Sequence, residues 1–134
     1  SQTVPWSRVT VGGKTFAEVL RDNPGRFEGV DLDKLVHDTV KAGWEILRRK
    51  GTTYYGIATT ATGIIKCILH DENRIIPVST LLEGEYGEHG VFCGVPAIIG
   101  RSGVKEIVQV PLTEQEQAKF HASTDVIRSY VKDL

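Results

Sequence analysis

The chain has 134 residues, of which 40% are hydrophobic and 25% are charged, and its formal net charge is −1 at pH 7. These values are ordinary for one globular domain with a real core, and the near balance of charge argues against binding to nucleic acid or an anionic membrane. No apolar stretch approaches the roughly 20 residues of a membrane helix, and the first residues lack the pattern of a signal peptide. We therefore expect a cytoplasmic protein.

Residues 6–15 have the pattern of a β-hairpin. Trp6–Val11 predicts a strand, Gly12-Gly13 a tight turn and Lys14-Thr15 the return. Phe16–Leu20 then predicts one helical turn, which Asn23-Pro24-Gly25 ends.

Two long helices are predicted next. Asp31 is a suitable N-cap for the first, and Gly51 ends it after about five turns, because apolar residues recur at three- and four-residue spacing between them. Thr52 or Thr53 caps the second helix, which runs to about residue 70. Since its small residues allow other backbones to approach closely, we expect this helix to be largely buried. These small residues are Gly56, Ala58 and Gly63.

Three β-rich runs follow, over residues 75–82, 91–99 and 104–110, and the last two are predicted to form a hairpin. Pro77 and Pro96 each remove a backbone donor, so both strands should lie at edges or carry bulges at the prolines. The two cysteines, Cys67 and Cys93, lie in apolar runs and are expected to be free, buried thiols.

Thr113 and Glu116 have the spacing of a capping box and begin a closing helix. One face of this helix is marked by Phe120, Thr124, Ile127, Val131 and Leu134. The whole pattern predicts an α+β fold, with an irregular antiparallel sheet packed against long helices. We expect one domain over residues 1–134 and no Rossmann domain in this chain.

No local pattern defines an active site. The loop Gly87–Gly90 holds the most enzyme-like histidine, His89, but a solvated loop histidine is the favoured interpretation. The four histidines are too far apart for a local metal motif, and neither a dinucleotide-binding glycine motif nor a P-loop occurs. Thr53 lies where a helix N-terminus favours a small anion, although spacing alone favours a simple cap.

The segment Lys50–Ala58, with the sequence KGTTYYGIA, resembles the lactate and malate dehydrogenase family at the junction of two helices in its substrate domain. Other segments follow in the order and approximate spacing of that family, so the resemblance covers essentially the whole chain. These segments are Pro5-Trp6-Ser7 with Gly12-Gly13, and residues 68–73, 77–79, 84–87 and 94–100. The fold it implies is that of the family's C-terminal domain.

In that family a hydride passes between NADH and the keto carbon of pyruvate, while a histidine with an orienting aspartate transfers the proton and arginines hold the substrate. By this resemblance, the histidine belongs to a Gly-Glu-His-Gly-Asp-Ser motif that ends just before Ser1, and the other groups lie further upstream, with an N-terminal dinucleotide-binding domain. The loop Gly87–Gly90 repeats only the first four letters of this motif, so His89 is given no catalytic role. We expect no catalytic residue in the chain, which contains no methionine and reads as an inactive fragment.

Two residues carry over from the resemblance: Thr53 as the substrate-contacting threonine, and Ile57 as the apolar residue near the nicotinamide ring of NAD. Malate dehydrogenases similar to this chain tend to have alanine and proline at these positions, which together with Trp6-Ser7 favours an L-lactate dehydrogenase that interconverts pyruvate and lactate. The alternatives are half of a malate or 2-hydroxyisocaproate-like L-2-hydroxyacid dehydrogenase, and a stand-alone binding or oligomerisation module. The resemblance also implies a homo-oligomer.

Overall fold

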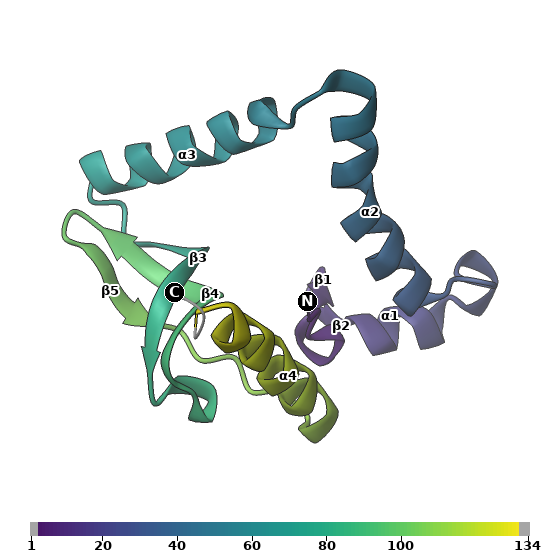
Figure 1. Cartoon of the computed structure of the whole chain (residues 1–134). Helices are drawn as coiled ribbons and strands as arrows, with labels where there is room; N and C mark the ends of the chain where they lie inside the picture. Colours follow the sequence, from purple (N-terminus) through teal and green to yellow (C-terminus); the bar gives the residue numbers. More distant parts are fainter. Residues whose placement is uncertain (1–2, 132–134) are drawn as a thin grey trace. The chain divides into compact units, whose positions relative to one another are not determined.

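A computed structural model of the chain describes residues 3–131 (Figure 1). These residues form two compact units, one made of residues 3–9 and 64–131 and the other of residues 10–63. The elements in chain order are the 3₁₀ helix η1 (Trp6–Arg8), β1 (Thr10–Val11), β2 (Lys14–Thr15), α1 (Phe16–Asp22), η2 (Pro24–Arg26), α2 (Leu32–Lys50), α3 (Tyr54–Leu69), β3 (Arg74–Glu83), η3 (Glu85–Gly87), β4 (His89–Gly100), β5 (Gly103–Ile107) and α4 (Glu114–Val131).

The predicted N-terminal hairpin is confirmed, but it is shorter than expected. Strands β1 and β2 pair antiparallel around Gly12-Gly13, both of which have positive φ. The prediction of a strand from Trp6 was wrong, because Trp6–Arg8 forms a 3₁₀ turn in which the Arg8 amide donates to the Pro5 carbonyl. Helix α1 then begins at a complete capping box made by Thr15 and Glu18.

Both long helices occur where the sequence predicts them. Asp31 caps α2 by accepting a hydrogen bond from the Lys34 amide. Gly51 ends the helix with φ of 79°, a conformation that favours glycine because it has no Cβ. Three basic residues occupy the last turn of α2, where they interact favourably with the helix dipole.

The expectation that α3 is largely buried was wrong in this structure. Only Cys67 of this helix is buried, whereas Ile57 is 69% exposed and Ile65 is 55% exposed. A Cβ added at Gly56 or Gly63 would meet no other atom within 4 Å, so the described residues supply no close backbone at either glycine. The apolar residues of α3 therefore form a helix face with few neighbours among residues 3–131.

The main sheet is three-stranded and antiparallel, in the order β3-β4-β5, and its last two strands form the predicted hairpin. Pro77 and Pro96 lie opposite each other. Neither proline can donate a backbone hydrogen bond to the other. Strand β3 is an edge strand as predicted, but β4 is central, and the irregularities fall beyond Leu82 and Ile98 instead of at the prolines.

Pro96 is tolerated in the central strand because β5 pairs with β4 only from Ala97 onward. At Pro96 the second edge of β4 therefore has no strand beside it. The Pro96 carbonyl instead accepts a hydrogen bond of 2.8 Å from the Val108 amide, just after β5 ends. The missing N–H of the proline thus costs no ladder hydrogen bond.

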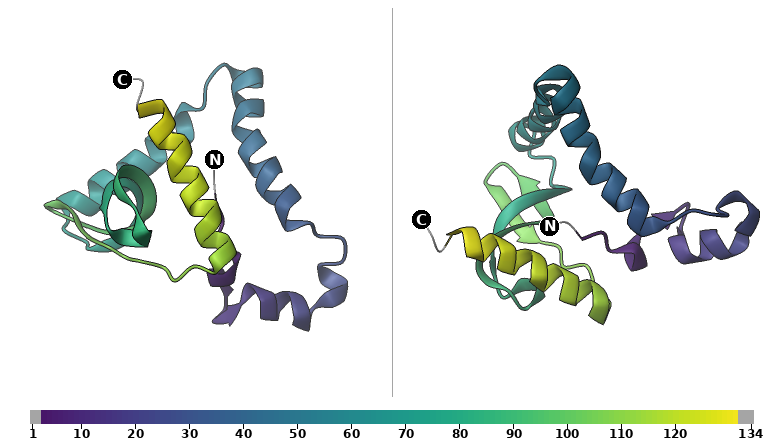
Figure 2. Two further views of the ribbon diagram at one scale, coloured as in Figure 1. Left: turned by 60° about the horizontal axis from the view of Figure 1, so that its bottom comes forward. Right: turned by 45° about the vertical axis from the view of Figure 1, so that its right-hand side comes forward.

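One face of this sheet carries the core of its unit, in two adjacent clusters. Leu82, Val91, Cys93 and Val95 are buried with Phe120 and Ile127 of α4 packed against them. Figures 1 and 2 show α4 lying beside the sheet. Ala97 and Ile99 are buried with Cys67 at the end of α3. Both cysteines are free and buried, as expected.

The capping box of α4 is confirmed: the Thr113 amide donates to Glu116 Oε2 at 3.0 Å, and the Glu116 amide donates to Thr113 Oγ1 at 3.3 Å. Phe120, Thr124 and Ile127 do face the sheet, and Thr124 is fully buried. Val131 was wrongly included in this face, because it is 60% exposed. Leu134 lies outside the described residues.

Candidate functional site

Thr53 and Ile57 lie on one side of the start of α3. The Gly51 amide donates to the Leu47 carbonyl at 2.7 Å and ends α2, and Thr52 and Thr53 then connect directly to α3. Thr53 is exposed, as is Ile57 one turn later. Because residues four apart share a face of a helix, the hydroxyl and the apolar side chain are neighbours. This arrangement offers an anion-favouring helix N-terminus beside an exposed apolar group.

Lys50 is a further group at this corner that the sequence analysis did not single out. Its Nζ lies 3.6 Å from the ring centroid of Tyr55 and 4.8 Å from that of Tyr54. The two rings are 4.6 Å apart. Cation–π contacts of this kind hold the Lys50 ammonium at the start of α3. The signal in the sequence is a lysine at the end of one helix followed by two tyrosines at the start of the next.

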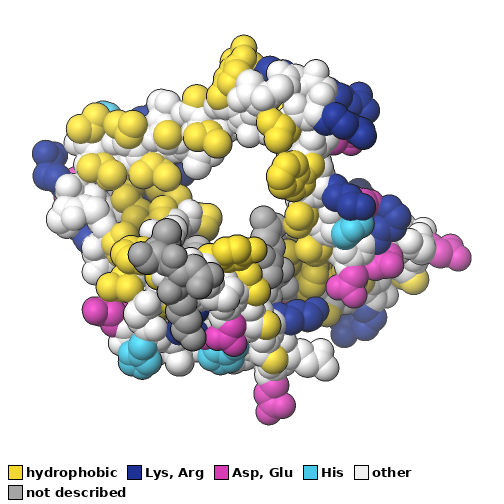
Figure 3. All heavy atoms as spheres, viewed as in Figure 1, with side chains coloured by type: hydrophobic (Ala, Val, Ile, Leu, Met, Phe, Trp, Pro, Cys, Tyr) yellow, Lys and Arg dark blue, Asp and Glu magenta, His cyan; other side chains and the backbone are white. Residues whose placement is uncertain are grey.

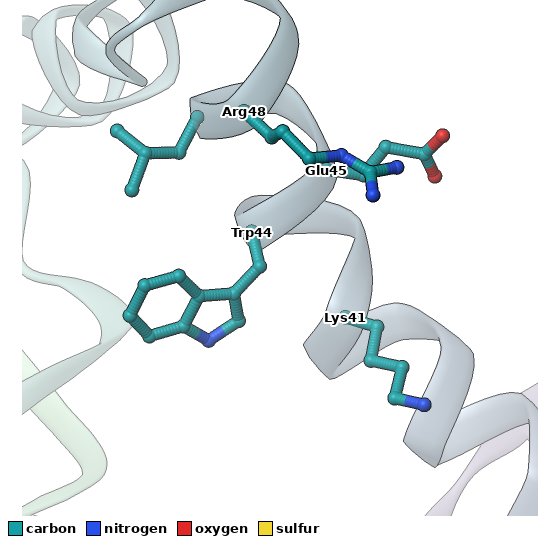
Figure 4. Close-up of a pocket in the computed structure, with 5 residues that line it drawn as sticks. Lys41, Trp44, Glu45 and Arg48 are labelled. Atoms are coloured by element: carbon teal, nitrogen blue, oxygen red, sulfur yellow. The ribbon is translucent and has the colours of Figure 1, made fainter.

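A hollow along α2 is separate from this corner. It has a volume of about 570 Å³ and is lined by Lys41, Trp44, Glu45, Leu47 and Arg48. Figure 4 shows the Trp44 ring pointing away from the helix on one side and the charged groups of Lys41, Glu45 and Arg48 on the other. Polar groups therefore do not converge in it as they do in a typical ligand pocket. Its apolar side belongs to the amphipathic pattern of α2, on which Trp44 is 71% exposed.

In the loop Gly87–Gly90, the buried side chain is that of Glu88, one residue before His89. Glu88 is 3% exposed, whereas His89 is exposed. The Glu88 carboxylate accepts hydrogen bonds from Thr124 Oγ1 at 2.7 Å, from His121 Nδ1 and from Arg128 Nη2. Burial raises the pKa of Glu88, but these three donors together outweigh burial and lower it.

His121 is not free to act as a general base. Gln117 Nε2 donates to the Tyr86 carbonyl at 2.5 Å, and the same nitrogen lies 2.9 Å from His121 Nε2. The amide nitrogen can only donate, so His121 Nε2 accepts from it while Nδ1 donates to Glu88. Both ring nitrogens are therefore used within the protein, and the Glu88 cluster (Glu88, His121, Thr124 and Arg128) is a structural network that joins α4 to the loop before β4.

The Cys93 thiol is also unsuited to nucleophilic chemistry. Burial raises the pKa of the Cys93 thiol, which disfavours the nucleophilic thiolate. Within residues 3–131, no three side chains of the metal-binding types come together as a metal site. No helix in the same range has the length and apolar character needed to cross a membrane.

Comparison with known proteins identifies the class to which this fold belongs. The family model described as "lactate/malate dehydrogenase, alpha/beta C-terminal domain" matches residues 1–134. The chain therefore belongs to the lactate/malate dehydrogenase family and corresponds to its C-terminal domain, with the α+β fold that the sequence predicts.

Within this family the chain is similar to L-lactate dehydrogenases. It is 51% identical over 134 residues to L-lactate dehydrogenase 3 of Bacillus anthracis, and 48% identical over 134 residues to L-lactate dehydrogenase 1 of Bifidobacterium longum. All of the chain is covered in both alignments, but it spans only 42% of the length of each relative.

Solved structures agree with this assignment. The ligand-bound minor L-lactate dehydrogenase of Enterococcus mundtii is 41% identical to this chain, with a TM-score of 0.91. The match covers 98% of this chain and 42% of the Enterococcus mundtii chain. The malate dehydrogenase of Aeropyrum pernix is 32% identical to this chain, with a TM-score of 0.82. The match covers 98% of this chain and 42% of the Aeropyrum pernix chain. Both structures thus contain this domain as less than half of a longer chain.

Proposed function

We propose that residues 1–134 form the substrate-binding domain of an NAD-dependent L-lactate dehydrogenase subunit. The observation that carries the proposal is the match of the whole chain to L-lactate dehydrogenases at about 50% identity. The exposed pair Thr53 and Ile57 supports it, because the two residues stand together at a helix N-terminus. The rest of the subunit supplies the catalytic histidine, aspartate and arginines and most of the dinucleotide site.

The described residues fit only one end of NAD. They include no glycine-rich loop between a strand and a helix to hold a pyrophosphate, but exposed Ile57 suits packing against a nicotinamide ring. NADH supplies the hydride when bound. Thr53 then donates a hydrogen bond to the substrate, and the first turn of α3 favours the negative charge of pyruvate.

The purified 134-residue chain should reduce pyruvate with NADH no faster than a buffer control, whereas the full-length subunit should turn over. The reason is that proton transfer and carbonyl polarisation need groups outside this chain. The measurement is the loss of NADH absorbance at saturating pyruvate, with intact mass to confirm each species. Turnover by the 134-residue chain above that of a mock purification would contradict the proposal that the catalytic groups lie outside it.

In the full-length enzyme, Thr53→Ala should lower kcat/KM for pyruvate about tenfold, the equivalent of one lost hydrogen bond to a bound substrate. The matched control is Thr62→Ala, because Thr62 lies on the same helix and its hydroxyl already donates to the Ala58 carbonyl at 2.8 Å. Equal kinetics for the two variants would remove Thr53 from the substrate site.

The substrate alternatives are tested in the same assay. A malate dehydrogenase would prefer oxaloacetate to pyruvate, and a 2-hydroxyisocaproate-like enzyme would prefer a branched 2-ketoacid. A natural start codon directly before Ser1, together with no upstream dinucleotide-binding region, would instead favour the stand-alone binding module. Any one of these three results would replace L-lactate dehydrogenase as the assignment.

We also propose that the protein is a homo-oligomer. Large apolar side chains are exposed on α2, on α3 and on the outer face of the sheet, and examples are Trp44, Ile57 and Phe92 at 71%, 69% and 61% exposure. Figure 3 shows hydrophobic side chains on the surfaces of these elements. Exposed apolar area of this kind favours association. Light scattering of the full-length protein tests the proposal.

A further inference from the structure

The N-terminal segment of the described chain, residues 3–8, is held by a carboxylate 109 residues away in sequence. The Ser7 amide donates to Glu116 Oε1 at 3.0 Å, and Ser7 Oγ donates to Glu116 Oε2 at 2.6 Å. Both oxygens of one side chain therefore bind both donors of one residue. Beside them, Arg8 Nε donates to the Pro111 carbonyl at 2.6 Å.

The Glu116 carboxylate is both ionised and fixed in orientation. Burial raises the pKa of Glu116, but hydrogen bonds from Ser7 and from Thr113 outweigh burial and lower the pKa to about 2. Glu116 thus stays ionised over the ordinary pH range and accepts the charge-assisted hydrogen bonds that are the stronger kind. Because Glu116 also belongs to the α4 capping box, its orientation is fixed by the helix itself.

A cavity lies beside Thr3 and Pro5, at the start of the same segment. It has a volume of about 180 Å³ and is lined by Thr3, Pro5, Tyr86, Val110, Leu112 and Phe120, among others. Hydrogen bonds to Glu116 and to the Pro111 carbonyl join Ser7 and Arg8 to α4 and to the segment before it.

We propose that Glu116 is a positioning residue that fixes Ser7 and thereby the path of the chain that enters this domain. The inference rests on the proposed function, in which the residues directly before Ser1 are the loop that carries the proton-transferring histidine. A misplaced loop slows the chemical step more than it weakens substrate binding, because catalysis depends on the distance and orientation of the reacting groups.

The experiment compares Glu116→Gln with Glu114→Gln in the protein at its full natural length. The control removes the same charge from the same helical turn, and Glu114 has no hydrogen bond to Ser7. Two quantities are measured: the hydrogen exchange rate of the Ser7 amide, and kcat and KM for pyruvate. Glu116→Gln should speed exchange at Ser7 about tenfold and lower kcat about tenfold, with KM changed less than about threefold. Glu114→Gln should leave both quantities near the parent values.

Unchanged exchange at Ser7 in Glu116→Gln overturns the contact, and faster exchange with unchanged kcat overturns the positioning role. If the protein has no lactate dehydrogenase activity, the proposed function fails, while the exchange measurement still tests the hold on Ser7. Should Glu116→Gln not fold, Ser7→Ala replaces it, because that change removes only the hydroxyl donor. Ser7→Ala should lower kcat in the same direction, and an unchanged kcat would overturn the proposal.

Discussion

Replacing Glu88 by glutamine should lower the free energy of unfolding by about 2–3 kcal/mol. The change keeps the size of the side chain but removes the charge that pairs with Arg128 and accepts the hydrogen bond from His121, in a site where Glu88 itself is 3% exposed. Removing one member of a buried ion pair costs about 3–5 kcal/mol, and the cost is smaller in this protein because Arg128 is 33% exposed and can regain water. Urea unfolding of the 134-residue chain, followed by circular dichroism, measures the difference.

Glu83→Gln is the matched control for that variant, because Glu83 lies on the adjacent strand end and is exposed. It should change the stability by less than about 0.5 kcal/mol. The effect of Glu88→Gln should also depend on pH in one direction. The pKa of Glu88 is lowered by folding, so its contribution is present above the ordinary value of 4.5 and disappears as the pH falls below it. Equal stability of Glu88→Gln and the parent at pH 7 would show that the cluster adds nothing.

The sequence predicted most elements because their signals are local. Asp31 and Gly51 delimit α2, the pair Thr113 and Glu116 begins α4, and both are backbone hydrogen-bonding patterns that adjacent residues complete. The exposure of α3 could not be predicted in this way, because burial depends on tertiary contacts, and Ile57 and Ile65 are 69% and 55% exposed. Composition reveals that a helix face is apolar, but it does not reveal which partner covers it.

The site shows the same limit. The letters of the loop Gly87–Gly90 draw attention to His89, but the buried and hydrogen-bonded group is Glu88, since its three donors come from α4, more than 30 residues later. No spacing rule connects residues that meet only through tertiary folding. Thr53 and Ile57 were proposed from the family resemblance of their segment, and their four-residue spacing on a helix is consistent with a common face. Their roles in binding remain predictions.

Leu82→Ala should lower the free energy of unfolding by about 3 kcal/mol, whereas Leu81→Ala should cost less than about 1 kcal/mol. Side chains alternate between the faces of a strand, so these neighbours on β3 point in opposite directions. Leu82 is fully buried opposite Val91, and Leu81 is 36% exposed opposite Phe92. Urea unfolding of the 134-residue chain measures both variants.

A larger loss for Leu81→Ala than for Leu82→Ala would mean that strand β3 presents its other face to the core, with its register shifted by one residue. Repeating the pair in the full-length protein then asks a second question. A cost for Leu81→Ala that grows there to about 2 kcal/mol would show that the outer sheet face, including Phe92, is covered in the full-length protein. A loss of unfolding free energy for Leu81→Ala that stays below about 1 kcal/mol would indicate that the outer sheet face is exposed to solvent. Subunit contacts would then be expected on α2 and α3.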